Sequence, residues 1–316
     1  AVAPFVLAVV SLRAYDADVT RVCESAYEQL QAAGVDVLYD DTADRPGAKF
    51  STMELIGVPD LIVVGPKGVK AGVVEFGPDT VFGFGLRDDA KASAFLRESG
   101  LEPGKFVCVI PRLRYTPYHR MKEDRRYSPT GARTESERTR DAINDRTAES
   151  DHARLRDMIV AWTKATRLKV LVCAEMTYQV ELGRTHLVEK LPTDVRRSVV
   201  WRENYWMPDE AASVYAQSLC VVGVEPHSLI MSLAAVTPIL HVRQPTDTMK
   251  GHMFRDIGLG DWLFEIEEAS GAQLAATLGA LTAGPAVARK RVREAMARVQ
   301  QLQRRMVDAV RACVPS

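Results

Sequence analysis

The residues best suited to chemistry lie between positions 219 and 262, where short apolar strands alternate with polar segments. The apolar run 219–222 is followed by Glu225, Pro226 and His227, which begin an apolar helix. An imidazole can donate a proton near neutral pH, and the amide groups at a helix start favour an anion. The spacing therefore predicts a proton donor beside a site for an anionic ligand.

Further polar side chains follow the other apolar runs in this half of the chain. The candidates for ligand contact are Arg112, Arg114, Glu175, Gln179, Glu225, Gln244, Lys250 and Arg255. Because ligands of open parallel sheets bind beyond the carboxyl ends of the strands, we expect these side chains to converge at one sheet edge. Guanidinium groups bind carboxylates and phosphates through paired N–H donors, so the set favours such a ligand.

A parallel sheet is needed to position these residues. Continuous apolar runs alternate with helical segments, a pattern typical of an α/β sheet covered by helices on both faces. We predict strands at 105–116, 168–174, 198–203, 219–223, 238–242 and 262–266. Residues from about 120 to 146 are densely charged, and we expect a mobile exposed loop there.

The first 76 residues predict a smaller α/β lobe. Apolar strands are expected at 5–12, 35–40 and 61–65, with a helix at 18–34 and a fourth strand within 69–76. This segment holds 6 basic and 11 acidic residues, a net charge of −5. Affinity for a phosphate backbone needs clustered positive charge, so the balance disfavours strong nucleic-acid binding.

Composition indicates an ordinary globular protein. Lys+Arg and Asp+Glu both total 41, so no overall charge points to nucleic acid or membrane. The five cysteines form no CxxC pair and mostly lie in or beside apolar runs, which favours buried free thiols in a reducing cytosol. No apolar run approaches the roughly 20 residues that span a bilayer. The free thiols and the lack of a spanning segment lead us to predict a cytoplasmic protein. The histidines lack metal-ligand spacing, so we predict no metal site.

The segments DVLYDDTADRPGAKF and LIGVPDLIVVGPKGVKAGVVE resemble the anticodon-binding domain of class II prolyl-tRNA synthetases. The resemblance stops at Phe76, so that domain is truncated. It implies tRNA as a partner, with Arg45 and Lys49 as candidate contacts. The synthetase catalytic domain has no counterpart in this sequence, and we expect no aminoacylation. A small lobe that serves only in packing is the alternative.

From about Pro78 the chain resembles polysaccharide pyruvyl transferases. The carrying segments are LEPGKFVCVIPRLRYTPYH, VLVCAEMTYQVELGR, VVGVEPHSLIMSLAAVTPIL and KGHMFRDIGLGDW. The resemblance implies the Rossmann-like C-terminal half of a glycosyltransferase-B-like arrangement. It also implies transfer of enolpyruvate from phosphoenolpyruvate to saccharide hydroxyls, with no cofactor. By position His227 would be the general acid and Arg112 the clamp for a phosphate or carboxylate.

Two departures leave alternatives open. Glu225 stands where that family usually has Arg or Met, and the family's N-terminal domain has no counterpart here. We therefore expect two domains, 1–76 and 77–316, joined in a chimera of natural or designed origin, with a site that is either active or idle. The alternatives are a tRNA-binding module and a nucleotide-sugar transferase that uses the same sheet edge.

Overall fold

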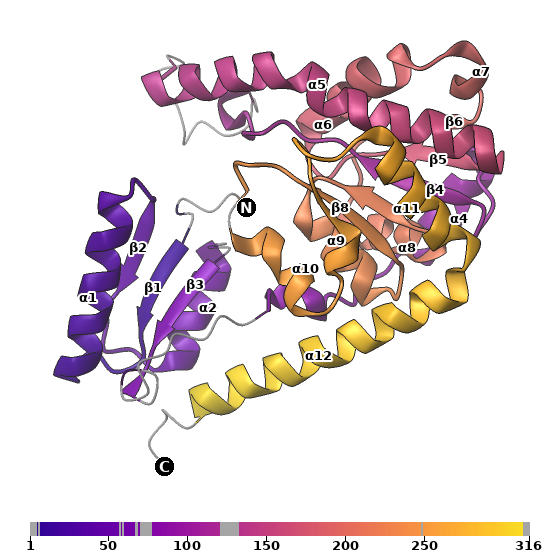
Figure 1. Cartoon of the computed structure of the whole chain (residues 1–316). Coiled ribbons are helices and arrows are strands. Elements are labelled where there is room, and N and C mark those ends of the chain that lie inside the picture. Colours follow the sequence, from indigo (N-terminus) through magenta and orange to yellow (C-terminus); the bar gives the residue numbers. More distant parts are fainter. Residues whose placement is uncertain are drawn as a thin grey trace. The chain divides into compact units, whose positions relative to one another are not determined.

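The computed structural model describes residues 5, 7–56, 58, 60–66, 69, 78–120, 133–247 and 249–311. The chain divides into two compact units (Figure 1). The first comprises residues 1–80 with 298–316, and the second comprises residues 81–297. Each unit is described by itself below.

Within residues 1–80, the described part of the first unit contains a small parallel sheet and the helices α1 and α2. Its elements are β1 (Leu7–Ser11), α1 (Ala17–Ala32), β2 (Val37–Asp40), α2 (Pro46–Ile56) and β3 (Asp60–Val64). The strand order is β2-β1-β3, and both pairings are parallel. The predicted strand within 69–76 lies, apart from Val69, outside the described residues.

Alternation along β1 explains why this unit has two cores. Val9 joins Val19 and Cys23 of α1 in one cluster, whereas Ala8 and Val10 pack with a methionine of α2 in the other. Successive side chains of a strand point to opposite faces, so a run of apolar residues buries both faces of the central strand.

The second unit is built around six short strands. They are β4 (Phe106–Ile110), β5 (Lys169–Val172), β6 (Val199–Trp201), β7 (Val221–Gly223), β8 (Ile239–Arg243) and β9 (Leu263–Glu265). The α-helices are α4 (Asp89–Glu98), α5 (Glu135–Thr166), α6 (Thr177–Leu182), α7 (Thr193–Arg196), α8 (Pro208–Gln217), α9 (Pro226–Ala234), α10 (Met253–Asp256), α11 (Gly271–Ala283) and the first part of α12 (Pro285–Arg311). From residue 298 onward, α12 belongs to the first unit. Short π and 3-10 segments complete the connections, among them Gly183–Leu187 and Met249–His252.

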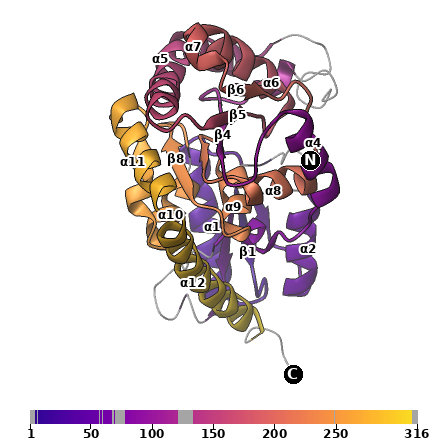
Figure 2. The same cartoon turned by 90° about the vertical axis from the view of Figure 1, so that its right-hand side faces the viewer.

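The six strands form one parallel sheet in the order β6-β5-β4-β7-β8-β9. Helices α5 and α11 cover one face, and α4, α8 and α9 cover the other (Figure 2). Successive strands run outward from β4 to β6, and the chain then returns to place β7 beside β4. This is the doubly wound Rossmann order, whose switch point lies between β4 and β7. The predicted α/β class with a parallel sheet is confirmed.

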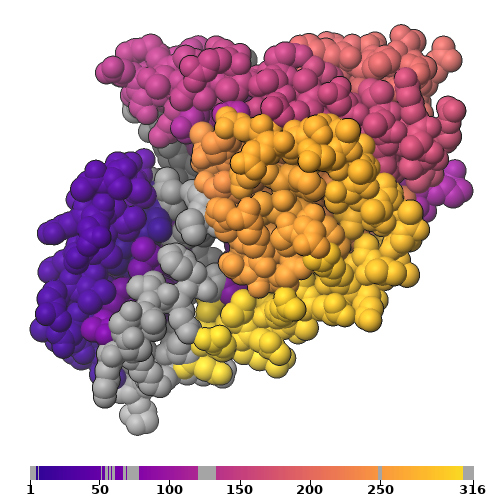
Figure 3. All heavy atoms as spheres, in the orientation of Figure 1, coloured from indigo at the N-terminus to yellow at the C-terminus, as the bar shows by residue number. Residues whose placement is uncertain are grey.

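The charged loop predicted at about 120–146 is wrong from Glu135 onward, because α5 begins there. Thr134 and Glu137 form a capping box, with the Glu137 amide 3.1 Å from the Thr134 hydroxyl. The first turns of α5 lie at the surface (Figure 3). Their buried positions include Asp141 and Asn144, so hydropathy showed no apolar stripe. Residues 121–132 lie outside the described part of the chain.

Polar residues of α5 are buried because they bind the segment that follows β4. The Asn144 amide accepts from the Tyr115 N–H at 2.9 Å and donates to the Tyr115 carbonyl at 2.8 Å. Asp151 accepts two bonds from Arg114. A buried polar group is stable only with such partners, so the polar side of α5 fixes the chain leaving β4.

The cysteines of both units match the sequence prediction where they are described. Cys23, Cys108, Cys173 and Cys220 are free and buried. Burial raises the pKa of Cys220 and of Cys108, which keeps both thiols protonated and unreactive. Within the described residues, no helix combines the length and apolar character that crossing a bilayer needs.

Candidate functional site

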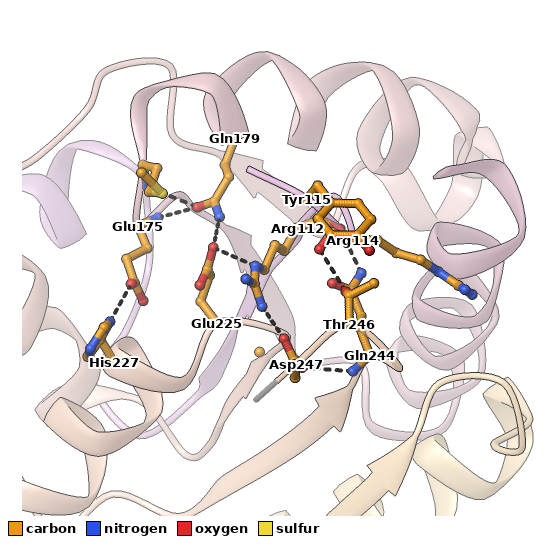
Figure 4. Close-up of polar contacts among 12 residues, drawn as sticks. Arg112, Arg114, Tyr115, Glu175, Gln179, Glu225, His227, Gln244, Thr246 and Asp247 are labelled. Atoms are coloured by element: carbon orange, nitrogen blue, oxygen red, sulfur yellow. Dashed lines mark hydrogen bonds and ion pairs between the residues drawn. The ribbon is translucent and has the colours of Figure 1, made fainter. Parts of the chain in front are cut away.

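A cluster of polar side chains lies at the switch point of the larger sheet (Figure 4). Arg112 follows β4, Glu175 and Gln179 follow β5, and Glu225 and His227 stand at the start of α9 after β7. Gln244 follows β8. Parallel strands bring the residues after their carboxyl ends to one edge, as the sequence predicted.

Arg112 is held between two carboxylates. Its Nε lies 3.2 Å from Oε1 of Glu225, and its Nη1 contacts Oδ1 of Asp247. Only 18% of the Arg112 side chain is exposed. Burial alone lowers the pKa of the guanidinium, but the charges of Glu225 and Asp247 outweigh it and raise that pKa. Arg112 is therefore a permanent, neutralised cation at the centre of the site.

Glu225 is a buried carboxylate at the N-cap of α9. It accepts a hydrogen bond of 2.7 Å from Nε2 of Gln179. Burial raises its pKa to about 7, against the opposing effect of Arg112. Oε1 of Gln179 accepts from the amides of Glu175 and Met176 at 2.7 and 2.9 Å, so one side chain ties the turn after β5 to α9.

Glu175 and His227 form the accessible part of the cluster. Oε1 of Glu175 lies 3.4 Å from Nδ1 of His227, and Oε2 accepts from the Ser228 amide at 2.8 Å and hydroxyl at 2.6 Å. Burial acts to raise the pKa of Glu175, but the bonds from His227 and Ser228 outweigh it and lower that pKa. His227 is 42% exposed, so solvent or substrate can reach its ring.

The α9 start differs from the open anion site that the sequence suggested. Its Ser228 amide is already bonded to Glu175, and this carboxylate has the position that an external anion was expected to take. Glu175 therefore caps α9 from a neighbouring strand. The arrangement holds the His227 ring beside Glu175, and the Ser228 amide is already occupied.

Gln244 is fully buried and structural in its contacts. Its Nε2 donates to the Arg112 carbonyl at 3.3 Å, and its amide donates to Oδ2 of Asp247 at 2.8 Å. Thr246 donates to the Arg114 carbonyl at 2.8 Å. The loop after β8 is thus bound along the chain that leaves β4, and it carries Asp247 to Arg112.

Three other residues predicted to contact the ligand lie away from His227 or outside the described part of the chain. Arg114 points away from His227 (Figure 4) and binds Asp151 and Glu267. Arg255 is half exposed and lies 3.6 Å from Glu265 at the end of β9. The side chain of Lys250 lies outside the described residues. Arg114 and Arg255 are therefore bound to other carboxylates and are not brought to His227.

Sequence reasoning missed Asp247 and Ser228. Ser228 directly follows His227 and could have been noticed as a helix-start residue that donates to a carboxylate. Asp247 lies in the QPTD segment, of which only Gln244 was among the predicted contacts. Nothing in the local sequence indicates which arginine its carboxylate would meet.

In the first unit, the two candidate tRNA contacts are placed differently. Arg45 is exposed just before α2. Lys49 is buried, with its Nζ 3.1 Å from Oδ1 and 3.2 Å from the carbonyl of Asp40. Lys49 is therefore committed to an internal ion pair, and its prediction as an RNA contact is corrected.

The titration of Glu225 yields a testable pH dependence. Its pKa is raised from 4.5 to about 7, so between these values the folded chain holds a proton that the unfolded chain has released. The free energy of unfolding then falls as the pH rises through this window. We expect Glu225→Gln to flatten that fall between about pH 5 and about pH 8 in urea titrations.

Tryptophan fluorescence can follow this unfolding, because all four tryptophans lie between residues 162 and 262 of the second unit. Glu267→Gln provides the control, since Glu267 is 57% exposed. Parallel pH curves for Glu225→Gln and the unsubstituted chain would show that Glu225 does not titrate in this range.

Comparisons with known proteins match the first segment of the chain to a protein family. A family model described as an anticodon binding domain matches residues 5–77. The proline–tRNA ligase of Parvibaculum lavamentivorans is 56% identical over 75 residues, 24% of this chain and 17% of that protein. The ligase of Caulobacter sp. strain K31 is 60% identical over 74 residues. The chain spans less than a fifth of the length of these relatives. The predicted resemblance of the N-terminal segment is confirmed.

Two solved structures align with most of the chain at low similarity. A trehalose-phosphate synthase from Burkholderia vietnamiensis has 13% identity and a TM-score of 0.42, covering 96% of this chain and 62% of that one. A glycosyltransferase from Rickettsia africae has 9% identity and a TM-score of 0.43, covering 98% and 99%.

Proposed function

We propose that residues 77–316 form a pyruvyl-transferase-like domain that moves enolpyruvate from phosphoenolpyruvate to saccharide hydroxyls. The observation that carries the proposal is that the His227–Glu175 pair and Arg112 lie on either side of Glu225 at the switch point of the sheet (Figure 4). An accessible imidazole held by a carboxylate suits proton transfer, and a nearby guanidinium suits an anionic donor. Residues 1–76 form the other proposed domain.

In the proposed reaction, His227 gives a proton to the methylene carbon of phosphoenolpyruvate. The neighbouring carbon becomes electron-deficient and forms a bond to a saccharide hydroxyl oxygen. Phosphate leaves with the electrons of its bond to that carbon, and a second hydroxyl of the same saccharide closes the ketal. The hydroxyl protons pass to His227 and to phosphate. Glu175 favours the protonated imidazole that starts the reaction.

The test is phosphate release from phosphoenolpyruvate in the presence of a panel of saccharide acceptors. A nucleotide sugar is the matched alternative donor, because a nucleotide-sugar transferase would use the same sheet edge. Turnover of phosphoenolpyruvate that needs an acceptor supports the proposal. Turnover of the nucleotide sugar alone would overturn it.

A second candidate function concerns residues 5–77, which match the anticodon-binding domain. We propose that this segment binds proline tRNA, with Arg45 as an exposed phosphate contact. The support is the 56–60% identity to proline–tRNA ligases over this segment. Its excess of acidic residues predicts weak, salt-sensitive binding.

Replacing Arg45 by alanine tests this RNA contact. We expect the slope of log affinity against log salt concentration to fall by about 1, the effect of one lost phosphate contact. Fluorescence anisotropy with a labelled proline tRNA transcript measures it. Arg21→Ala is the matched control, because Arg21 is 74% exposed on α1 and pairs with Asp18. An equal effect of both substitutions would count against a specific role for Arg45.

A further inference from the structure

The carboxylate of Asp247 occupies a position built from two different donors. One oxygen contacts the guanidinium of Arg112, and the other accepts from the Gln244 amide at 2.8 Å. Only 4% of the Asp247 side chain is exposed. A guanidinium and a backbone amide side by side match the two coplanar oxygens of a carboxylate. We call this pair of donors, from Arg112 and Gln244, the carboxylate cradle.

Buried polar atoms around the carboxylate cradle are incompletely satisfied. Among the described residues, Nε of Arg112 has no aligned hydrogen-bond partner, although Glu225 lies 3.2 Å away. Oε1 of Gln244 also lacks a partner there. Buried polar groups are normally hydrogen-bonded, so such atoms together mark a place where another polar group can bind.

The charges at the carboxylate cradle select the class of ligand. Arg112 faces Asp247 and Glu225, and the Asp247 carboxylate alone already balances the positive charge of Arg112. Exchanging the Asp247 carboxylate for a ligand carboxylate leaves that balance unchanged. Placing a phosphate dianion there would add a further buried negative charge, which is costly.

We infer that Asp247 is an internal stand-in for a ligand carboxylate, and that Arg112 and the Gln244 amide bind this carboxylate rather than a phosphate. The inference rests on the proposed function, since it assigns the carboxylate end of phosphoenolpyruvate to this position. Ligand binding then requires the loop after β8 to withdraw Asp247. Asp247 sets the specificity and weakens the apparent affinity, because it competes for the same donors.

Asp247→Ala in the full 316-residue chain tests the inference. Pyruvate and inorganic phosphate serve as separate probes in calorimetry at constant ionic strength. We expect pyruvate to bind about tenfold more tightly to the variant, the worth of one charge-assisted hydrogen bond, and phosphate to gain nothing. Asp247→Asn keeps the shape without the charge, and it should show the same direction if the alanine variant fails to fold.

Two further variants make the result specific. Adding Arg112→Gln to Asp247→Ala should abolish the gain for pyruvate. Asp151→Ala removes a carboxylate whose two oxygens both accept from the guanidinium of Arg114, and it should gain no pyruvate affinity. The inference is overturned if Asp247→Ala and Asp247→Asn leave pyruvate binding unchanged, if phosphate gains equally, or if Asp151→Ala responds in the same way.

The outcomes separate the inference from the proposed function. Pyruvate binding that depends on Asp247, in a chain that never turns over phosphoenolpyruvate, would count against the transferase alone. Turnover of phosphoenolpyruvate without any effect of Asp247 on pyruvate binding would count against the carboxylate cradle alone.

Discussion

Replacing His227 by asparagine is expected to lower acceptor-dependent phosphate release from phosphoenolpyruvate by about 100-fold to 10,000-fold, the usual worth of a positioned general acid. Asparagine is close in size and can still donate to Glu175, so the start of α9 should keep its structure. The loss should fall on kcat, because His227 is proposed to act on the reacting carbon. A coupled phosphate assay over a range of donor concentrations measures it.

Two variants control this result. Glu175→Gln keeps an acceptor for the Ser228 amide but removes the charge that favours a protonated His227, so we expect a smaller loss together with a shifted pH profile. His186→Asn is the matched histidine control, because the His186 ring packs on His152, with centroids 5.2 Å apart, and lies outside the described cluster. Unchanged turnover in His227→Asn would rule out its role as the acid.

The convergence of polar residues at one sheet edge could be predicted from the sequence, because it depends on the order of strands and helices along the chain. Once apolar strands alternate with helices, the doubly wound topology brings together the residues after each strand. This placed Arg112, Glu175, Glu225 and His227 near one another. The position of the switch point between β4 and β7 was not predicted, because it follows from the strand order in the structure.

The partners of charged residues could not be predicted in the same way. Arg112 and Arg114 are two positions apart, yet one meets Glu225 and Asp247 and the other meets Asp151 and a glutamate after β9. Such pairs join loops far apart in sequence, and their choice depends on packing that no local pattern records. The start of α5 was missed for a related reason, since its buried side is polar and is satisfied only by distant backbone groups.

Replacing Lys49 by methionine is expected to destabilise the first unit by about 3–5 kcal/mol, the cost of leaving one charge of a buried pair without its partner. Methionine keeps most of the volume but removes the ammonium group, and among the described residues Asp40 then keeps only the bonds from the Thr42 amide at 3.1 Å and hydroxyl at 2.7 Å. The amide groups of β1 should lose a matching amount of hydrogen-exchange protection. Mass spectrometry of peptides covering β1 and β2 measures this loss.

The same variant decides between a structural and an RNA-binding role for Lys49. If Lys49 is a surface contact, its replacement should weaken tRNA affinity and leave exchange protection intact. If Lys49 forms the buried pair, its replacement should mainly lower exchange protection. Adding Asp40→Asn to Lys49→Met should restore part of the lost protection, because no unpaired charge then remains. Arg21→Met removes a pair of similar length, 2.8 Å, in which both side chains are more than two-thirds exposed, and it should cost less than about 1 kcal/mol. Protection lost equally in Arg21→Met and Lys49→Met would refute the assignment of Lys49 to the core of the unit.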